Sequence, residues 1–358
     1  MTARPHNAAR RSLLGGLLVG VTGAQALALT PLLAQEFVNA RMSTPQVHAS
    51  TLVELADGSL LAAWFGGTAE RAPDVRIWCA RRQAGGWLAP EPVADGVQPD
   101  GTRLPTWNPV LFRADGAQGS RVLLFYKVGP SPQQWWGELI TSDDGGRTWS
   151  APQRLPDGAL GPIRSKPLLL PDGTLLCPSS TEDDEGHWRI HFERSQGLGR
   201  SWQVGPPVPD PQGLALIQPS LVLRPDGSVL AFARSLSNRI AVTRSVDGGL
   251  SWSPPELTSL PNPNAGIEAL GLADGRLLMV FNPRERGRDW WNGRDRLDVA
   301  VSADGGRRWR TVLTLEDEPG QEFSYPAAIQ SRDGSVHISY TFKRRQIRHV
   351  QLDPRRLG

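Results

Sequence analysis

Six of the Asp-Gly pairs in the sequence stand between two short apolar runs, and these six recur at nearly constant intervals. Successive pairs begin 58, 57, 54, 48 and 59 residues apart. An Asp-Gly pair between apolar runs is a strong signal for a β-hairpin. The six pairs are Asp57-Gly58, Asp115-Gly116, Asp172-Gly173, Asp226-Gly227, Asp274-Gly275 and Asp333-Gly334. This regular spacing predicts a repeat architecture and disfavours an ordinary β-sandwich.

A second motif, Ser-x-Asp-x-Gly-x-x-Trp, stands between the Asp-Gly pairs and is known as the Asp-box. Three copies are complete, at 142–149, 245–252 and 302–309, and a fourth at 195–202 has Gly197 in place of the aspartate. We expect the aspartate to cap the turn, a glycine to supply a positive φ, and the tryptophan to pack on the sheet. The motif lacks the alternating acidic ligands of a calcium loop, so a structural role is predicted and no metal is expected.

Six repeats of paired hairpins predict an all-β, six-bladed β-propeller. The 38 glycines and 31 prolines agree with a turn-rich chain rather than a helical one. We expect one propeller domain over residues 36–358, with the last strand at 347–352 pairing near the N-terminal strand to close the ring.

The first 35 residues have the layout of an export signal. Arg10-Arg11 precedes 24 uncharged residues, and the next charge is Glu36. This arrangement is similar to a twin-arginine signal, with small-residue cleavage sites at 24–26 or 26–28. An uncleaved membrane anchor is the alternative. The sequence therefore predicts a periplasmic or secreted protein with no membrane contact after cleavage.

The charge distribution does not favour nucleic acid as a partner. The formal charge is +3, only Lys127, Lys166 and Lys343 are lysines, and no long basic run with interleaved aromatic residues occurs. Cys79 and Cys177 are too few for a disulfide framework or a zinc site. We expect a monomer that needs no cofactor.

The residues that enter the innermost strand of each predicted blade are polar and differ from blade to blade. They are His48, Asn108, Lys166, Gln218, Glu268 and Tyr325. A scaffold requires the same residue at repeated positions, whereas a binding site requires varied polar groups. We therefore predict a site at the mouth of the central channel; the plainer alternative is a ring of solvated strand ends.

These residues resemble the sialidase (neuraminidase) superfamily, and the resemblance covers about residues 40–352. It implies an exo-glycosidase site at the centre of a propeller, with a tyrosine nucleophile and three arginines that bind a carboxylate. Tyr325 matches the nucleophile by its place before the last Asp-Gly pair. Arg234 matches the second arginine, and Arg294 matches the third, with Arg296 as a rival.

The sequence departs from the family pattern at two positions. His48 stands where the first arginine is expected, and Gln218 stands where the family has the glutamate that activates tyrosine. Glu268 of the neighbouring blade is the substitute that we consider for this glutamate. The acid/base carboxylate of the family corresponds best to Glu70, with Asp74 as the second candidate. Such a carboxyl group needs a pKa raised by partial burial.

A tyrosine nucleophile suits an anomeric carbon that carries a carboxylate, because a carboxylate nucleophile would be repelled there. Arg103 and Lys166 are candidates for additional positive charge. Trp107, Trp135 and Trp136 are candidates either for walls that stack on a sugar or for blade packing.

We predict an exported, sialidase-like exo-glycoside hydrolase that releases a terminal, acidic sugar from an oligosaccharide or glycoconjugate by a retaining mechanism. One alternative is another carbohydrate-active propeller, an exo-arabinanase or a lyase, in which His48 is the acid/base. The other is a non-catalytic propeller that binds glycans or assists assembly.

Overall fold

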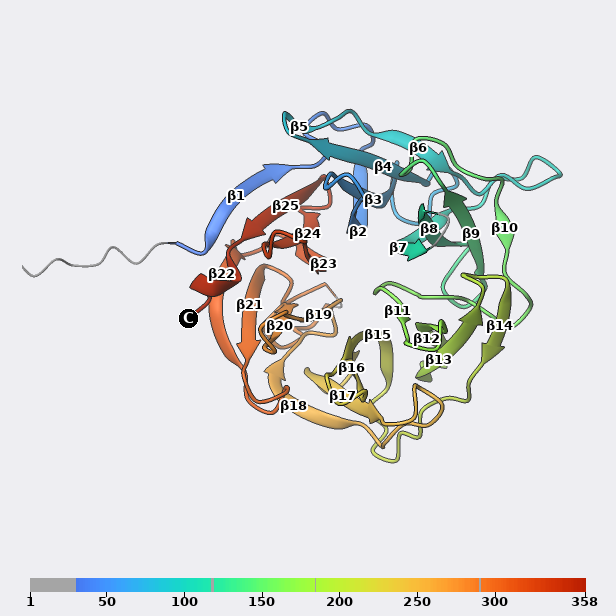
Figure 1. Ribbon diagram of the computed structural model, residues 1–358. Coiled ribbons are helices and arrows are strands. Elements are labelled where there is room, and N and C mark those ends of the chain that lie inside the picture. Colours follow the sequence, from blue (N-terminus) through green and yellow to red (C-terminus); the bar gives the residue numbers. More distant parts are fainter. Residues whose placement is uncertain (1–29, 117–118, 184, 290) are drawn as a thin grey trace, which may run out of the picture. The chain divides into compact units, whose positions relative to one another are not determined.

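Six antiparallel sheets form a ring over residues 31–358 in the computed structural model (Figure 1). The structure describes residues 30–116, 119–183, 185–289 and 291–358. The predicted export signal lies almost entirely outside the described residues. No helix in the described ranges is long and apolar enough to cross a membrane. The prediction of an all-β, six-bladed propeller is confirmed.

The strands of each blade follow one another from the centre of the ring outward. Blade 1 contains β2 (Gln46–Glu54), β3 (Leu60–Gly67) and β4 (Arg76–Gln83), with β5 (Gly86–Trp87) and β6 (Glu91–Ala94) both paired to β4. Blade 2 contains β7 (Thr106–Gly116), β8 (Gly119–Val128), β9 (Trp136–Ser142) and β10 (Gln153–Arg154). Blade 3 contains β11 (Leu168–Leu169), β12 (Leu175–Glu182), β13 (Trp188–Gln196) and β14 (Ser201–Val204). Blade 4 contains β15 (Leu216–Leu223), β16 (Val229–Ser235), β17 (Arg239–Ser245) and β18 (Glu256–Pro261). Blade 5 contains β19 (Glu268–Gly271), β20 (Leu277–Phe281), β21 (Arg296–Ser302) and β22 (Arg310–Asp317). Blade 6 contains β23 (Phe323–Gln330), β24 (Val336–Phe342), β25 (Gln346–Leu352) and β1 (Leu32–Phe37), and the short 3-10 helix η1 (Pro354–Arg356) follows.

The ring is closed by the first strand of the chain, which is the outermost strand of the last blade. β1 pairs with β25 in antiparallel register from Leu32↔Leu352 to Phe37↔Arg348, as predicted for residues 347–352. Because β1 begins at Leu32, the propeller starts slightly before the expected boundary at residue 36. Closure in this way pairs an edge that would otherwise be free.

The six Asp-Gly pairs and the Asp-boxes are turns at one end of the ring, which we call the turn face. Each of these six Asp-Gly pairs lies where the first strand of its blade turns into the second, and Asp115-Gly116 are the last two residues of β7. Every Asp-box begins at the end of the third strand and leads to the fourth. In the Asp-box of blade 4, the Asp247 carboxylate accepts hydrogen bonds from the backbone N–H groups of Leu250 (3.1 Å) and Ser251 (2.9 Å). Trp252 stacks on Phe192 of blade 3 with 3.7 Å between ring centroids. The Asp-box therefore caps its own turn and packs on the preceding blade.

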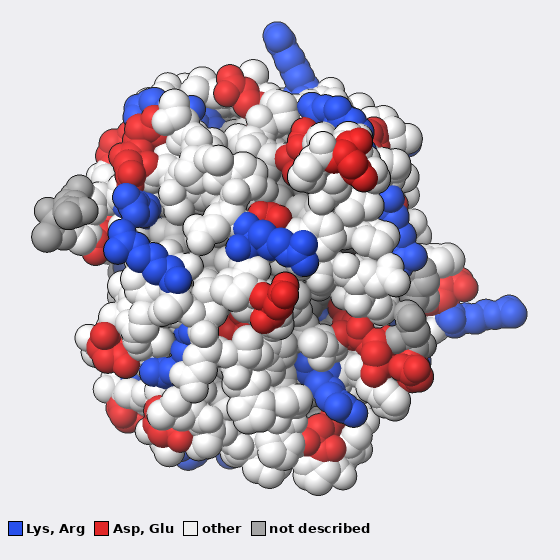
Figure 2. Space-filling view, turned by 90° about the vertical axis from the view of Figure 1, so that its right-hand side faces the viewer, with Lys and Arg blue, Asp and Glu red and all other residues white. Residues whose placement is uncertain are grey.

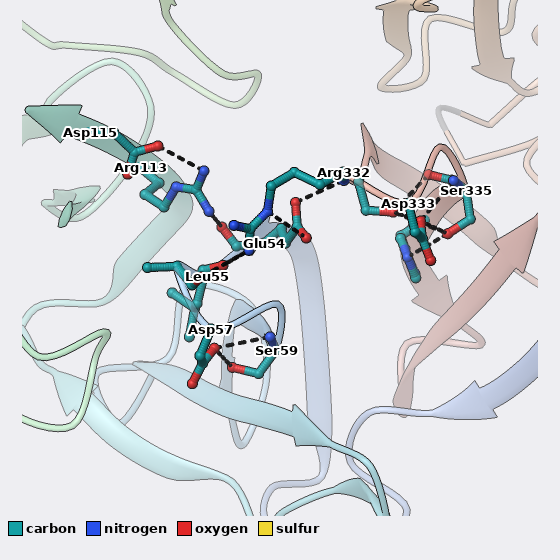
Figure 3. Close-up of polar contacts among 12 residues, drawn as sticks. Glu54, Leu55, Asp57, Ser59, Arg113, Asp115, Arg332, Asp333 and Ser335 are labelled. Atoms are coloured by element: carbon teal, nitrogen blue, oxygen red, sulfur yellow. Dashed lines mark hydrogen bonds and ion pairs between the residues drawn. The ribbon is translucent and has the colours of Figure 1, made fainter.

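Polar contacts between neighbouring blades also hold the turn face together (Figure 3). Arg332 of blade 6 binds the Glu54 carboxylate of blade 1 through its backbone N–H (3.1 Å) and its side-chain Nε (3.2 Å). Arg113 of blade 2 donates to the carbonyl oxygen of Glu54 at 2.6 Å. Glu54 thus joins three consecutive blades, and each contact satisfies a polar group at a blade junction.

The core lies within the sheets and between adjacent blades, where the apolar faces of the strands pack. Cys79 and Cys177 are both buried and unoxidised in this core. On the flank that carries β10 and β14, basic and acidic side chains are interspersed (Figure 2). That flank therefore has no extended field of one sign.

Candidate active site

The end of the ring opposite the turn face, which we call the cavity face, contains a central cavity of about 720 Å³. The inner strands begin at this face, and the loops from second to third strands and the connections between blades also reach it. The cavity is lined by Glu70, Arg71, Glu182, Trp188, Arg234, Leu236, Asn264, Arg286, Arg294 and Tyr325. Four arginines face two glutamates, so the lining carries an excess of positive charge.

Several inner strands begin with a β-bulge that places one residue in the left-handed region. The residues at these bulges are Asn108 (φ 40°), Gln218 (φ 53°) and Tyr325 (φ 54°). In blade 1 the corresponding residue is Ala49 (φ 54°), so the expected alignment of His48 with this ring is wrong by one residue. A bulge redirects a side chain, and positive φ in a residue other than glycine is uncommon and concentrated at functional sites.

Tyr325 and Arg234 meet at the centre of the cavity. The Arg234 Nη1 donates to the Tyr325 hydroxyl oxygen at 2.9 Å and to Gln218 Oε1 at 3.1 Å, and its Nε donates to Asn264 Oδ1 at 2.7 Å. All three partners are neutral, and among the described residues no carboxylate forms an ion pair with Arg234. Because Arg234 lines the cavity, its charge is available to an anion bound there.

Arg294 is the second predicted arginine that reaches the cavity, and it belongs to a chain of ion pairs. Glu322 accepts from Arg294 Nη1 at 3.3 Å and from Arg344 Nε at 2.8 Å, and Arg344 Nη1 donates to Glu70 at 2.7 Å. Burial opposes ionisation of Glu322, but Arg344 and Arg294 outweigh this effect and lower its pKa. The chain connects blades 5, 6 and 1 and holds Arg294 in place beside the Tyr325 ring, at 5.7 Å from its centroid.

Glu268 does not contact the Tyr325 hydroxyl and does not line the cavity. Its carboxylate accepts from Arg164 Nη2 at 3.0 Å and from Ser165 Oγ at 2.9 Å, and burial raises its pKa despite the nearby cations. Arg164 in turn donates to the carbonyl oxygen of Pro326 at 2.7 Å. Glu268 therefore positions the backbone after Tyr325 through Arg164, rather than acting on the phenol as expected.

Buried polar groups of blades 2 and 3 hold the segment that carries Arg164. The Glu193 carboxylate accepts the backbone N–H groups of Leu160 (2.9 Å) and Gly161 (2.7 Å). The fully buried Lys127 donates to the carbonyl oxygen of Pro162 at 2.9 Å, and burial lowers its pKa to about 8. These bonds replace strand pairing in a blade whose inner strand is only two residues long.

His48 packs behind Tyr325 and does not line the cavity. It is 2% exposed, its ring centroid lies 4.1 Å from that of Tyr325, and Nδ1 lies 2.9 Å from Thr341 Oγ1. Burial, followed by the positive charges of Arg344, Arg294 and Arg234, lowers its pKa well below the ordinary value. His48 is thus a neutral wall for the tyrosine ring, which differs from its expected contact with a substrate carboxylate.

The remaining predicted residues lie away from the cavity. Asp74 accepts from the backbone and hydroxyl of Thr68 within its own loop, and Arg103 lies near Asp95 in an exposed connection. Asn108 is buried at its bulge, and Lys166 is directed toward Thr51 at 3.3 Å, with its pKa lowered to about 8 by burial. Arg296 pairs with Asp298 and Asp317, so Arg294 is the arginine that reaches the site.

The tryptophans divide between the two expected roles. Trp107 and Trp135 are buried against each other, with 5.9 Å between their ring centroids, and pack with Ile163. Trp136 is half-buried and lines a second cavity between blades 2 and 3. Trp135 lines the same cavity but is only 9% exposed, so Trp107 and Trp135 mainly stabilise the blades, and Trp136 offers more surface for sugar stacking.

Several residues that line the cavity were not selected from the sequence: Arg71, Glu182, Trp188, Asn264 and Arg286. Arg164, Glu322 and Arg344, which contact and position residues of the site, were not selected either. Most lie in loops between the second and third strands or in connections between blades. In a propeller these segments share the end of the ring at which the inner strands begin. Each of these loops follows an Asp-Gly turn after one strand length. Counting one strand onward from each Asp-Gly turn would therefore have pointed to these loops.

The fold and the cavity together define a sialidase-like propeller with an arginine-lined centre. The chain belongs to the BNR repeat-like domain family, whose model matches residues 58–338. A protein of unknown function from Dyadobacter fermentans has a similar structure, with a TM-score of 0.71 and 18% identity over 90% of this chain and 98% of that one.

Two sialidase structures share the same fold. The Hadza microbial sialidase Hz136 matches with a TM-score of 0.71 and 18% identity over 86% of this chain and 66% of that one. The intramolecular trans-sialidase of Ruminococcus gnavus, solved with oseltamivir carboxylate, matches with a TM-score of 0.68 and 16% identity over 92% and 99%. No curated protein is significantly similar in sequence.

Proposed function

We propose that this protein is an exo-acting glycoside hydrolase that removes a terminal sugar bearing a carboxylate. The observation that carries the proposal is the position of Arg234, which faces the cavity with only neutral partners and binds the Tyr325 hydroxyl at 2.9 Å. A guanidinium group binds a carboxylate through two parallel hydrogen bonds, and desolvation in a cavity strengthens this contact. Arg294 supplies a second cation from the neighbouring blade.

Tyr325 is the proposed nucleophile. Its phenolic oxygen attacks the anomeric carbon on the face opposite the departing oxygen, and water then hydrolyses the glycosyl-tyrosine, so that the configuration is retained. Because arginine only donates hydrogen bonds, the Tyr325 oxygen is the acceptor from Arg234 and the phenolic proton is free to leave. The positive charge of Arg234 stabilises the phenolate that forms.

The substitution at Gln218 is consistent with this arrangement. Gln218 is a neutral acceptor for Arg234 Nη1, which leaves the charge of Arg234 uncompensated. A glutamate at this position would neutralise that charge. Activation of Tyr325 in this chain is therefore proposed to depend on a cation rather than on a carboxylate base. The similar trans-sialidase solved with oseltamivir carboxylate supports a ligand that bears a carboxylate.

The test is release of sugar from a panel of sialyl, uronyl, arabinosyl and rhamnosyl glycosides by the wild-type protein and by Tyr325→Phe. We expect turnover of an acidic glycoside and a loss of about 10³-fold or more in Tyr325→Phe. Tyr126→Phe is the matched control, because it removes a buried hydroxyl that has no hydrogen-bond partner in the described part of the chain. Tight glycan binding without turnover of any glycoside would instead support a binding protein.

We also propose that the protein acts outside the cytoplasm. The support is the twin-arginine-like start followed by 24 uncharged residues. Fractionation of cells that express the full chain, with Arg10→Lys and Arg11→Lys as the matched change, tests this location. Retention of an active protein in the cytoplasm in both cases would contradict it.

A further inference from the structure

A second cavity of about 360 Å³ lies on the cavity face between blades 2 and 3. Its walls come from the loop between β8 and β9, from the connection over residues 154–160 and from the end of β12. Glu182 is the one described residue that lines both this cavity and the central one. A carboxyl group therefore stands at the junction between two adjoining spaces.

The surroundings of Glu182 differ from those of the other cavity glutamate. The Glu70 carboxylate accepts a hydrogen bond from Arg344 Nη1 at 2.7 Å. Within the described residues no hydrogen bond or ion pair binds the Glu182 carboxyl group. Burial raises the pKa of Glu182, although the charges of Arg234 and Arg71 oppose the shift. Glu182 thus combines a place at the junction of the two cavities with surroundings that favour its protonated form.

We propose that Glu182 is the proton donor to the glycosidic oxygen, and that the cavity between blades 2 and 3 binds the sugar unit that leaves. This inference rests on the proposed hydrolase function. In a glycoside bound across both cavities, the terminal acidic sugar occupies the central cavity beside Tyr325, and the scissile bond lies at the junction. The acid must stand at that bond, and Glu182 occupies this place.

The reaction balances with the groups named. The C–O bond to the Tyr325 oxygen forms as the glycosidic C–O bond breaks, the Glu182 carboxyl proton passes to the departing oxygen, and the phenolic proton is lost to water in the cavity. In the second step the Glu182 carboxylate takes a proton from water, whose oxygen bonds to the anomeric carbon. The Tyr325 oxygen departs and regains a proton.

The walls of the second cavity suit a neutral sugar ring. Trp136 is half-buried there and offers an indole surface, and Arg154 lies over that ring at 4.6 Å from its centroid. Gln133 and Asp157 also line the space and provide polar groups for sugar hydroxyls. A volume of about 360 Å³ is at the lower end of the range for small-molecule sites. These features favour one leaving-group sugar rather than a long chain.

The proton donor is tested with pairs of substrates that differ in their need for an acid: 3′-sialyllactose with sialyl fluoride, and a glucuronyl disaccharide with glucuronyl fluoride. For Glu182→Gln we expect kcat/KM to fall about 10³-fold with the disaccharide and less than tenfold with the fluoride. Glu185→Gln, an exposed glutamate that lines neither cavity, is the control and should retain wild-type values. Equal effects of Glu182→Gln on both substrates, or a selective loss in Glu70→Gln instead, would overturn the assignment.

The leaving-sugar site is tested separately by equilibrium binding, followed by tryptophan fluorescence, of 3′-sialyllactose against sialic acid and of the glucuronyl disaccharide against glucuronic acid. We expect the disaccharide to bind about tenfold more tightly, Trp136→Ala to abolish this difference, and Trp136→Phe to restore most of it. Equal affinities for mono- and disaccharides would overturn the site.

If the wild-type protein turned over none of these substrates, the proposed function and the proton-donor role would both fail. The binding measurement would still decide the leaving-sugar site by itself.

Discussion

The two ends of the propeller use the same six-fold framework in opposite ways. On the turn face the same residue does the same work in successive blades: Asp57, Asp172 and Asp226 each accept the backbone N–H two residues further on, at 3.0, 2.9 and 3.0 Å. On the cavity face corresponding positions hold Ala49, Asn108, Gln218 and Tyr325, all at positive φ. Repetition at one end stabilises the ring, and the opposite end is thereby free to vary.

The difference extends to how charges are neutralised. On the turn face the carboxylates of the Asp-Gly pairs bind backbone N–H groups of their own turns, so each of these contributes on its own, whereas Glu54 joins neighbouring blades. Cavity-face charges form connected chains, such as Glu70, Arg344, Glu322 and Arg294. Removal of one member of such a chain leaves a buried charge without its partner, and the cost is therefore larger.

Glu322→Ala is expected to have the largest effect on both stability and activity. It leaves Arg294 and Arg344 without their shared carboxylate, and we expect the free energy of unfolding to fall by about 3–5 kcal/mol and kcat/KM to fall about 100-fold. Urea denaturation and kinetics measure the two effects. Glu318→Ala is the control, because Glu318 forms an exposed pair with Lys343 and its loss should cost less than about 1 kcal/mol. If the two variants lost equal free energy of unfolding, the connected charges of the cavity face would be no more important for stability than a separate ion pair.

Acidification is expected to weaken the seam that closes the ring, where titratable groups extend inward from the turn face. His337 lies between Ser335 (3.2 Å) and His349 (2.9 Å), and His349 lies 3.2 Å from Glu36 of β1. Burial, with a contribution from His349, lowers the pKa of His337 from 6.5 to about 4. Between pH 6.5 and pH 4, His337 is therefore protonated in the unfolded chain but remains neutral in the native protein.

The contribution of His337 to the free energy of unfolding should thus be constant above pH 6.5. As the pH drops toward 4, the free energy of unfolding should fall by on the order of 3 kcal/mol. Below pH 4.5 the loss continues in the same direction, because the pKa of Glu36 is lowered to about 2 by its hydrogen bond to His349, against the opposing effect of burial. Thermal unfolding as a function of pH measures the slope, and His337→Gln should make it shallower. An unchanged slope in that variant would exclude His337 as its source.

The contrast between the two faces also explains what the sequence could predict. Asp-Gly turns and Asp-boxes are short, local and repeated, so their spacing was sufficient to predict six blades and the closing strand. Tyr325, Arg234 and Arg294 were found because the resemblance to sialidases places a tyrosine and two arginines at fixed offsets from such turns.

The partners of these residues could not be found in this way. Arg164 reaches Tyr325 from blade 3 through an irregular segment with no offset to follow. Glu182 is distinguished by its burial and by its place at the junction of the two cavities. His48 was placed one residue out of register because the bulge in β2 has no proline to mark it. These features depend on three-dimensional contacts between blades, which no local pattern encodes.

Asp247→Ala tests the independence of turn-face contacts. It removes the acceptor for two backbone N–H groups and for the hydroxyls of Ser245 and Ser251, and we expect a loss of about 1–2 kcal/mol in unfolding free energy with unchanged kcat/KM. The neighbouring Val246→Ala changes an exposed residue of the same turn and should stay within about 0.5 kcal/mol of wild type. The Asp-box of blade 3 has Gly197 in place of this aspartate, yet its turn keeps the hydrogen bond from Gly199 N–H to Ser195 Oγ at 3.0 Å. The turn of blade 4 should therefore also form without Asp247. A change in activity would show that the two faces are coupled.

Gly266→Ala is expected to have the smallest effect and examines how tightly Tyr325 is held. A Cβ atom at Gly266 would lie 3.2 Å from Tyr325 Cγ and 3.4 Å from Arg164 Cδ, so the ring must move by a few tenths of an ångström. We expect kcat/KM to fall about fivefold, equivalent to about 1 kcal/mol in the activation barrier, with little change in unfolding free energy. Gly271→Ala is the matched control, because its Cβ would meet Val222 Cγ1 at the same 3.2 Å but on the far end of β19 from Tyr325. If both variants lost activity equally, general crowding at the two ends of β19 would be responsible. If only Gly266→Ala lost activity, the orientation of the tyrosine ring limits the rate.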